Sequence, residues 1–264
     1  MTFGRDLQLA RELADIADPI TTAYERKAGT LHIERKADDS PVTEVDRAVE
    51  SALRRALRVA RPDDAFLGEE GGGPTAGAGA ERRWIIDPID GTQSYVSGGS
   101  DWLTYIALEV NQRLEVAVIS SAPRRRRWEA TRGAGAWCNG RRLLTSDTNR
   151  LTGAAWSTYL GDDGTLDLDP IRRMRGASPD MRQPHSYTDV ADGSIDLAFD
   201  LFGGEWDFAA PKLLVEEAGG RMTDLAGRDR IDTGEMLATN GHLHSAALGL
   251  IGHPEDGAMP AAPR

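Results

Sequence analysis

Two carboxylates that could do chemistry stand close together in the segment WIIDPIDGT, residues 84–92. Asp87 and Asp90 follow an apolar run typical of a buried strand, so both side chains leave the core where the backbone turns. Oxygen ligands at about 2 Å are what Mg²⁺ requires, and Pro88 restricts the backbone between the two acids. Asp-Pro and Asp-Gly are also common turn formers, so the segment alone leaves both a plain turn and a cation site open.

A phosphate-binding arrangement follows the second acid. Gly91 has no Cβ, so a ligand can approach its backbone closely, and Thr92 offers a hydroxyl at an expected helix start. Exposed backbone N–H groups at a helix start favour phosphate. The segment therefore combines candidate ligands for a cation with candidate donors for an anion.

Two acids elsewhere each have a structural explanation as well as a functional one. Asp46 lies three residues after Thr43, and this spacing fits a capping box at the start of a helix. Glu69 follows Gly68 at the end of a short expected strand, where acids commonly face solvent. The sequence around each of them leaves the structural and the metal-binding interpretations open.

A further acid, Asp207, opens an expected helix over residues 207–218, which Gly219 and Gly220 end. A carboxylate in the first turn compensates the helix macrodipole, and this is its structural explanation. The segment GGEW before the helix predicts an irregular approach, which could direct the carboxylate toward a ligand instead.

Helices and strands must bring these acids together, and hydrophobic periodicity predicts their order. Helices are expected at 6–24, from Thr43, at 187–191, at 207–218 and from His242. Strands are expected at 65–67, 84–86, 103–110, 114–120, 128–131, 154–159, 195–199, 221–224 and 237–239. Pro19 should kink the first helix or end it early. The four arginines of residues 124–127 are expected to form an exposed basic turn.

A polar run, TSDTNR at residues 145–150, marks an expected domain boundary. Residues 1–147 are predicted to form an N-terminal α+β domain, with two helices on a largely antiparallel sheet, and residues 148–252 a C-terminal α/β domain. The glycine-rich segment 71–80 is expected to be a flexible loop. The tail, residues 253–264, is expected to be disordered.

The composition excludes several classes of protein. Of the 264 residues 40% are hydrophobic, and no apolar run approaches the roughly 18 residues of a membrane span, which predicts a cytoplasmic protein without a membrane partner. The net charge of −11 argues against a nucleic-acid partner. It also argues against a phosphorylated substrate, unless bound cations neutralise several of the acids. The single cysteine, Cys138, excludes an internal disulfide.

Three motifs resemble, in order and spacing, the inositol monophosphatase family of Mg²⁺-dependent phosphatases. They are GEE at residues 68–70, WIIDPIDGT at 84–92 and WDFAAPKLLVEEAGG at 206–220, and the likeness extends over nearly the whole chain. The resemblance implies an α+β fold of the layered αβαβα sandwich type, usually dimeric. It favours the metal-binding interpretation of the acids over the turn, cap and loop interpretations.

The resemblance implies a set of metal ligands. One Mg²⁺ would be held by Glu69, Asp87 and the carbonyl of Ile89. A second would be held by Asp87, Asp90 and Asp207. The shared ligand, Asp87, would therefore bridge the two ions.

It also implies how the phosphate and the attacking water are held. Asp46 would contact Thr92 or a weakly bound third ion, and Gly91 and Thr92 would bind phosphate. Lys36 matches a basic position near the family's site. Glu69 and Thr92 would orient a water, activated by the metal, for in-line attack on the phosphoryl group.

Within the family, the chain is most similar to the histidinol-phosphatases, through the segments LHIERKADDSPVTEVDRAVE, SAPRRRRWEATRGAGAW and ATNGHLH. Asp200 matches the family's substrate-recognising acid, which fits a hydroxyl or an ammonium group. The chain departs from the pattern at residues 182–185, where the family has a glycine followed by a small or acidic residue. Arg182 and His185 stand there instead, and both are candidates for substrate binding.

Histidinol phosphate is therefore the predicted substrate of a predicted homodimer. Inositol-1-phosphate, or another polyol or specialised-metabolite phosphate, is the alternative within the same chemistry. Two further hypotheses are a nucleotidase acting on 3′(2′),5′-bisphosphates and an inactive metal-binding regulator.

Overall fold

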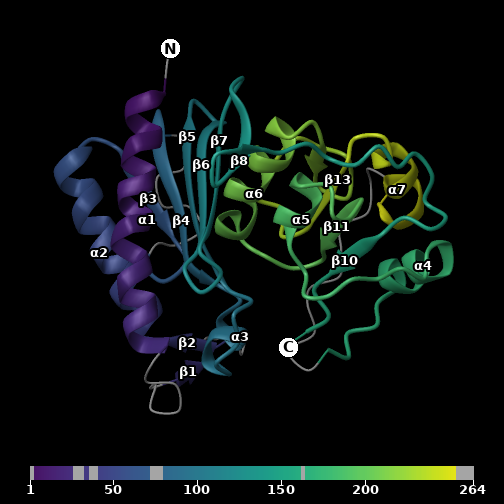
Figure 1. Ribbon diagram of the computed structural model, residues 1–264, viewed down its shortest axis with the longest axis horizontal. Helices are drawn as coiled ribbons and strands as arrows, with labels where there is room; N and C mark the ends of the chain where they lie inside the picture. Colours follow the sequence, from purple (N-terminus) through teal and green to yellow (C-terminus); the bar gives the residue numbers. More distant parts are fainter. Residues whose placement is uncertain (1–2, 26–32, 36–40, 72–79, 162–163, 254–264) are drawn as a thin grey trace.

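Five layers of alternating helices and sheets make up the molecule (Figure 1). The computed structural model describes residues 3–25, 33–35, 41–71, 80–161 and 164–253. Two long helices, α1 (Gly4–Glu25) and α2 (Glu44–Ala60), cover the outer face of a seven-stranded sheet. Two more, α5 (Tyr187–Ala191) and α6 (Glu205–Glu217), lie between that sheet and a four-stranded sheet. The predicted αβαβα sandwich is confirmed.

The seven-stranded sheet carries most of the acids. Its strands are, in spatial order, β3 (Ala65–Gly68), β4 (Arg82–Asp90), β5 (Leu103–Val110), β6 (Arg113–Ser121), β7 (Arg126–Thr131), β8 (Gly135–Cys138) and β9 (Arg141–Arg142). Only the β3–β4 pair is parallel among these neighbours. Parallel strands end at the same edge of a sheet. The residues that follow β3 therefore lie beside the end of β4.

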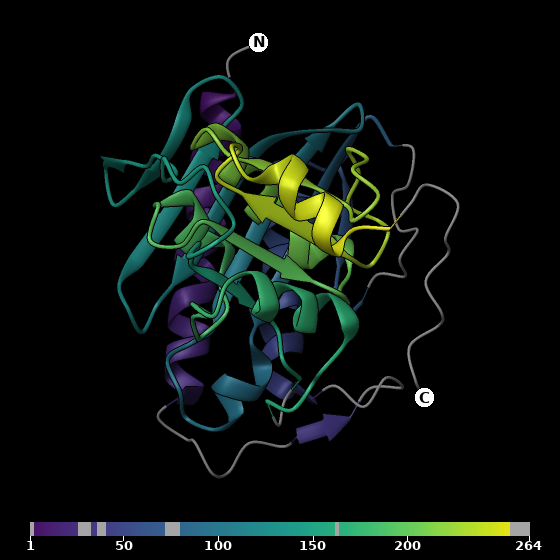
Figure 2. The same cartoon turned by 90° about the vertical axis from the view of Figure 1, so that its right-hand side faces the viewer.

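The four-stranded sheet has the order β10 (Trp156–Thr158), β11 (Leu197–Asp200), β13 (Met236–Thr239) and β12 (Arg221–Thr223). Strands β10 and β11 are parallel, and the other two pairs are antiparallel. Helices α4 (Asp169–Ala177) and α7 (His244–Ile251) cover its outer face, which Figure 2 turns toward the viewer. Asp200 is the last residue of β11. Helices α5 and α6 separate this strand from the first sheet (Figure 1).

Alternating side chains of β4 explain why the first sheet is covered on both faces. Ile85 belongs to the apolar cluster shared with α6, whereas Trp84 and Ile86 belong to the cluster shared with α1 and α2. All three side chains are buried. Since successive side chains of a strand point to opposite faces, an unbroken apolar run is what a strand buried on both faces needs.

Buried ion pairs fix α6 against the first sheet. Arg83 on β4 donates to Glu109 on β5 (3.0 Å) and to Glu205 at the start of α6 (2.7 Å). At the other end of the helix, Glu217 accepts the backbone N–H groups of Gly133 and Gly135, both at 2.9 Å. The first turn of α6, which carries Asp207, is therefore held at a fixed place beside β4.

Some elements differ from those expected. The hairpin of β1 (Ile33–Arg35) and β2 (Pro41–Thr43), and helix α4, were not predicted. Helix α1 does not end early at Pro19 but continues to Glu25. The short helix α3 (Thr92–Val96) begins at the expected residue.

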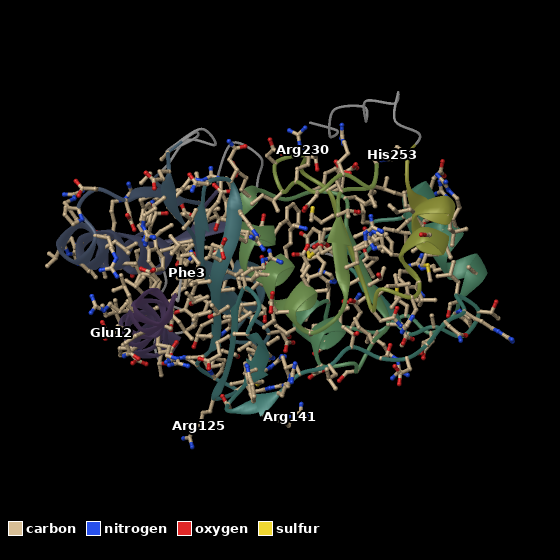
Figure 3. The ribbon with its side chains drawn as sticks, turned by 90° about the horizontal axis from the view of Figure 1, so that it is seen from above. Phe3, Glu12, Arg125, Arg141, Arg230 and His253 are labelled. Atoms are coloured by element: carbon tan, nitrogen blue, oxygen red, sulfur yellow. The ribbon has the colours of Figure 1, made fainter. Side chains whose placement is uncertain are left out.

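The expected exposed turn of four arginines is only partly correct. Arg125 projects away from the fold, as Figure 3 shows. Arg124 pairs with Asp101, Arg126 with Asp192, and Arg127 with Asp15 and Asp18. Strand β7 begins at Arg126, so the second half of the run faces neighbouring elements and finds acidic partners there.

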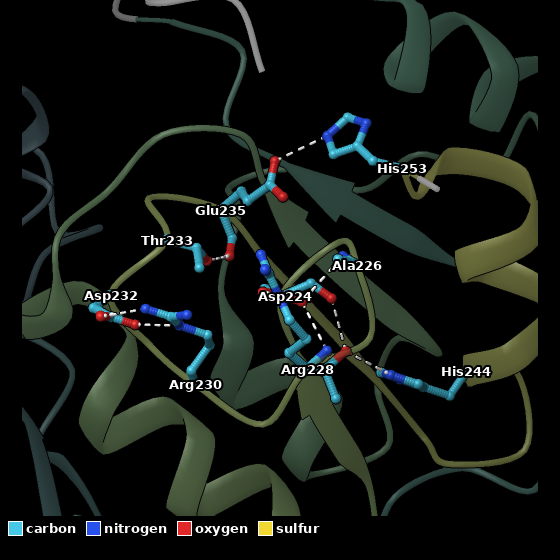
Figure 4. Close-up of polar contacts among 10 residues, drawn as sticks. Asp224, Ala226, Arg228, Arg230, Asp232, Thr233, Glu235, His244 and His253 are labelled. Carbon is cyan, nitrogen blue, oxygen red and sulfur yellow. Dashed lines mark hydrogen bonds and ion pairs between the residues drawn. The ribbon is translucent and has the colours of Figure 1, made fainter. Parts of the chain in front are cut away.

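The connection between β12 and β13 is held by its own polar contacts (Figure 4). The buried Asp224 carboxylate accepts from the backbone N–H groups of Ala226 and Arg228 and from the Arg228 guanidinium. Farther on, Glu235 pairs with His253 at 3.0 Å. These contacts hold the connection that leads into β13, whose first residue, Met236, pairs with Asp200 of β11.

The described residues include no helix long and apolar enough to cross a membrane. The predicted domain boundary at residues 147 and 148 falls between the last strand of the first sheet and the first strand of the second. The division into two domains and the cytoplasmic location both stay predictions. Lys36, most of the glycine-rich segment and the tail from residue 254 lie outside the described residues.

Candidate metal centre

Three of the predicted ligands converge on one point. Carboxylate oxygens of Asp87, Asp90 and Asp207 all lie within 4.8 Å of one another. The first two come from the end of β4 and the third from the first turn of α6. The chain thus brings together acids that are more than a hundred positions apart in sequence.

Glu69 joins the same group from the loop after β3. It hydrogen-bonds the Asp87 side chain, and its charge raises the pKa of both Asp87 and Asp207. Because β3 and β4 are parallel neighbours, Gly68 pairs with Ile86 and the next residue lies at the end of β4. All four acids that were predicted to hold metal therefore face one another.

Burial and mutual repulsion shift these acids in the same direction. Loss of hydration raises the pKa of Asp87 and of Asp207 well above its ordinary value, and the neighbouring carboxylates add to the effect. The pKa of Asp90 rises to about 6, chiefly through burial, although the hydrogen bond from Tyr105 lowers it. A cluster of this kind has a high affinity for positive charge, either protons or cations.

Each of the three aspartates accepts a hydrogen bond that fixes its orientation, and its carboxylate keeps further lone pairs that a cation could use. Asp87 accepts the backbone N–H of Ile89 (2.9 Å), and Asp207 accepts that of Gly204 (2.6 Å). Asp90 accepts the hydroxyl of Tyr105 at 2.6 Å. Tyr105 was missed by the sequence analysis. It lies opposite Asp87 in the β4–β5 ladder, so only the strand register could have indicated it.

Asp46 serves as the helix cap that the sequence predicted. One carboxylate oxygen accepts the backbone N–H of Thr43 (2.8 Å) and its hydroxyl (2.6 Å), which completes the capping box of α2. The other oxygen is buried and has no hydrogen-bond partner. Burial, together with the charge of Glu69, raises the pKa of Asp46 to about 6. Asp46 therefore lies near the acid group as well as in a cap, and its metal role stays a prediction.

The turn after Asp90 is shaped by Gly91. Its φ of 85° lies in the left-handed region, and a Cβ there would come within 2.6 Å of the Asp101 carbonyl oxygen. Glycine is thus required by the protein's own backbone. The Thr92 hydroxyl donates to the carbonyl oxygen of Ile89 at 2.9 Å, so two residues that were predicted to serve the site are in contact.

A histidine and a carboxylate form the side of the site nearest the second sheet. His185 Nε2 lies 2.9 Å from Asp200 Oδ2, and Nδ1 lies 3.0 Å from the Ser157 hydroxyl. Burial lowers the pKa of His185, but the charges of Asp200 and Asp90 raise it, and the net shift is upward. The ring of Tyr187 packs edge-on against the imidazole, with centroids 4.9 Å apart. Ser157 and Tyr187 were not among the predicted site residues.

Arg182 lies apart from this pair. Its side chain is exposed, and its guanidinium hydrogen-bonds Asp180 at 2.9 Å. The structure thus brings two of the predicted substrate-binding residues, Asp200 and His185, into contact. The third, Arg182, contacts Asp180 instead. A substrate role for Arg182 stays a prediction.

The donor set fits a hard divalent cation. Clustered carboxylates, with a backbone carbonyl beside them, are the oxygen ligands that Mg²⁺ prefers. Burial and the neighbouring carboxylates raise the pKa values of Asp87, Asp90 and Asp207, so keeping all three ionised requires positive charge beside them. A bound cation would supply that charge.

Comparisons with known proteins agree with this geometry. The model of the inositol monophosphatase family matches residues 5–253. Over 254 residues the chain is 39% identical to a histidinol-phosphatase of Mycobacterium tuberculosis, with 92% of this chain and 96% of that protein covered. It is 40% identical, over 93% of this chain and 96% of the other, to a Streptomyces griseus protein named glucose-1-phosphate thymidylyltransferase.

The fold has a close counterpart among solved structures. The extragenic suppressor protein SuhB of Bartonella henselae superposes with a TM-score of 0.84 and 27% sequence identity, over 97% of this chain and 100% of that one. Family match, relatives and fold extend over the same residues, including those of the acid cluster. The chain belongs to the inositol monophosphatase family and is a phosphoric monoester hydrolase.

Proposed function

We propose that the protein is a Mg²⁺-dependent phosphatase that hydrolyses the phosphate monoester of a small alcohol. The observation that supports this most strongly is the convergence of Asp87, Asp90 and Asp207 within 4.8 Å, with Glu69 hydrogen-bonded to Asp87. The family consists of metal-dependent phosphatases, and this cluster is the part of the chain suited to hold the metal.

Asp87 has the central place in the proposed metal site. Glu69, Asp87 and the Ile89 carbonyl would hold one ion, and Asp87, Asp90 and Asp207 a second. Asp46, whose buried oxygen has no hydrogen-bond partner, is the candidate for a third. Bound divalent ions would offset the negative charge of the phosphoryl oxygens and lower the pKa of the attacking water.

The protein's own groups orient the reactants. The Thr92 hydroxyl donates its proton to the carbonyl oxygen of Ile89, so its oxygen can accept a hydrogen bond from a water. Glu69, whose side chain contacts Asp87, would take the second proton of that water. Gly91 and Thr92 would bind the phosphate through their backbone N–H groups. The Asp200 and His185 side of the site would receive the alcohol.

Histidinol phosphate is the first candidate substrate. Its support comes from the relative of M. tuberculosis, at 39% identity, which is named for that activity. Asp200 could bind the ammonium group of histidinol, because a carboxylate pairs well with a buried cation.

A polyol phosphate is the second candidate, and the surroundings of Asp200 favour it. One Asp200 oxygen lies 2.9 Å from His185, and the other accepts the backbone N–H of Tyr159 at 3.3 Å. An imidazole beside the carboxylate weakens its attraction for a second cation, whereas a neutral hydroxyl can still bind.

A substrate panel tests the proposal. Histidinol phosphate, inositol-1-phosphate, glycerol-2-phosphate and an adenosine 3′,5′-bisphosphate should be assayed with Mg²⁺ and with EDTA. Mg²⁺-dependent release of phosphate from one of the first three supports the proposal. Activity on the bisphosphate alone would identify a nucleotidase. Full activity in EDTA would refute the metal-dependent mechanism, and no activity with intact Mg²⁺ binding would favour a regulator.

We further propose that the protein forms a homodimer. Light scattering coupled to gel filtration measures its mass directly. A mass of one chain across the accessible concentration range would contradict this part of the proposal.

A further inference from the structure

A buried glutamate that the proposed mechanism does not use lies beneath the loop carrying Glu69. Glu50 is in the middle of α2, and its exposed fraction is only 4%. A buried carboxylate is costly unless its oxygens are hydrogen-bonded. Its partners therefore show what it contributes to the fold.

Both carboxylate oxygens of Glu50 are engaged. Oε2 accepts the backbone N–H of Glu70 at 2.7 Å, and Oε1 accepts the Arg54 guanidinium at 2.9 Å. Arg54 lies one helical turn farther along α2, and its guanidinium stacks over the ring of Phe66 on β3. The arginine thus offsets the charge of Glu50 and leaves the other oxygen to hold the loop.

The loop is shaped around this carboxylate. A Cβ at Gly68 would lie 2.4 Å from Glu50 Oε2, and a Cβ at Gly71 would lie 2.6 Å from Oε1. Both distances are shorter than any van der Waals contact, so only glycine permits the carboxylate to sit this close. The residue between Gly68 and the hydrogen-bonded Glu70 is Glu69, whose side chain reaches Asp87.

We propose that Glu50 is a positioning residue, which anchors the Gly68–Gly71 loop from below and so directs the Glu69 carboxylate toward Asp87 and the metal. The proposal rests on the proposed metal role of Glu69. Groups that orient metal ligands commonly change metal affinity by about 10–100-fold when they are removed. Glu50 is expected to act in this way although it touches neither the metal nor the substrate.

The test compares Glu50→Gln with Glu44→Gln, which removes the same charge from an exposed position on the same helix. Glutamine keeps the shape, but its amide can accept from only one of the two donors, Glu70 N–H or Arg54. Mg²⁺ binding is measured by isothermal titration calorimetry, and the exchange of the Glu70 amide hydrogen by NMR or mass spectrometry. Urea unfolding in EDTA reports stability separately.

Glu50→Gln should weaken Mg²⁺ binding about tenfold and speed exchange at Glu70. Raising the Mg²⁺ concentration should restore most of kcat. Glu44→Gln should behave as the wild type in Mg²⁺ binding, in exchange at Glu70 and in kcat. A second variant, Gly71→Ala, leaves Glu50 in place but pushes on its carboxylate, and it should also weaken Mg²⁺ binding. If Glu50→Gln does not fold, the Mg²⁺ affinity of Gly71→Ala is sufficient to test the proposal.

Wild-type Mg²⁺ affinity in both folded variants, or in Gly71→Ala alone if Glu50→Gln is unfolded, would overturn the role of Glu50. If the wild type itself binds no Mg²⁺, the proposed function fails instead. The two failures are therefore distinguishable.

Discussion

At the scale of single residues, Asp87 is the group on which the proposed chemistry depends most. It is buried, it contacts Glu69, and its oxygens lie within reach of Asp90 and Asp207. Removing its charge also removes repulsion among the four acids. A substitution that removes this charge should therefore abolish activity without destabilising the fold, which is uncommon for a buried residue.

Asp87→Asn should lower kcat by about 10³-fold or more, because a shared ligand of both ions is lost. The free energy of unfolding in EDTA at neutral pH should stay the same or rise, since one repulsive charge is gone. Steady-state kinetics and urea unfolding check the two expectations. Asp169→Asn, at an exposed position in α4, is the matched control and should keep wild-type activity. An Asp87→Asn enzyme that retains a tenth of the activity would contradict the shared-ligand role.

His185→Asn should change which alcohol is preferred. Loss of the imidazole frees Asp200 Oδ2 for a cationic group, so kcat/KM for histidinol phosphate relative to inositol-1-phosphate should rise about tenfold. Asp200→Asn should move that ratio in the opposite direction. Competition assays with both phosphates measure the ratio directly. An unchanged ratio in both variants would show that this pair does not face the alcohol.

At the scale of elements, the β4–α3 turn links the metal site to the phosphate site, and its geometry depends on Gly91. The conformation is left-handed, and the Asp101 carbonyl oxygen occupies the place where a Cβ would be. Close approach of a ligand is the reason that the sequence alone suggests for this glycine. The structure gives a different reason, since the neighbouring backbone already requires it.

Gly91→Ala should destabilise the protein by clearly more than Gly140→Ala. Both glycines have positive φ, which costs alanine about 1–2 kcal/mol, but Gly140 has open space around it whereas Gly91 has a backbone oxygen at 2.6 Å. Urea unfolding measures the difference, and only Gly91→Ala should also reduce activity. Equal destabilisation of the two variants would show that the close contact with Asp101 carries no strain.

At the scale of the whole molecule, the acid cluster makes stability depend on pH and on metal. The pKa of Asp90 is about 6 in the folded protein, above its ordinary value of 3.8. Between these two pH values the folded state binds more protons than the unfolded state, so this group's contribution to stability is lost as pH rises. His244 acts in the opposite sense, because burial lowers its pKa to about 4.

A comparison with Asp90→Asn isolates the contribution of Asp90 from that of His244. In EDTA, the wild type should lose about 3 kcal/mol relative to the variant as pH rises from 4 to 6.5, at about 1.4 kcal/mol per tenfold change in proton affinity. At pH 7, Mg²⁺ should raise the free energy of unfolding of the wild type, and it should raise that of the variant by less. Urea unfolding at each pH measures both effects. A difference that does not change with pH would show that Asp90 has an ordinary pKa.

The sequence by itself determined much of this protein. The unbroken apolar run before Asp87 predicts a strand buried on both faces, Thr43 and Asp46 predict a capped helix, and the glycines after residue 218 end α6. These features depend on neighbours within a few residues, which is why pattern and propensity suffice. The identity of the family followed from three motifs whose residues are local as well.

Only the tertiary structure decided which distant residues meet. The parallel pairing of β3 with β4 places Glu69 beside Asp87, and the β4–β5 register brings Tyr105 to Asp90. The contact of His185 with Asp200 depends on the segment from Met181 to His185, which runs alongside β10, the neighbour of β11. Nothing within one segment encodes such contacts, because they depend on strand order and register across the sheets. For the same reason the sequence did not indicate a role for Glu50: the backbone N–H of Glu70 that it accepts lies twenty residues away, in a loop whose glycines make room for its carboxylate.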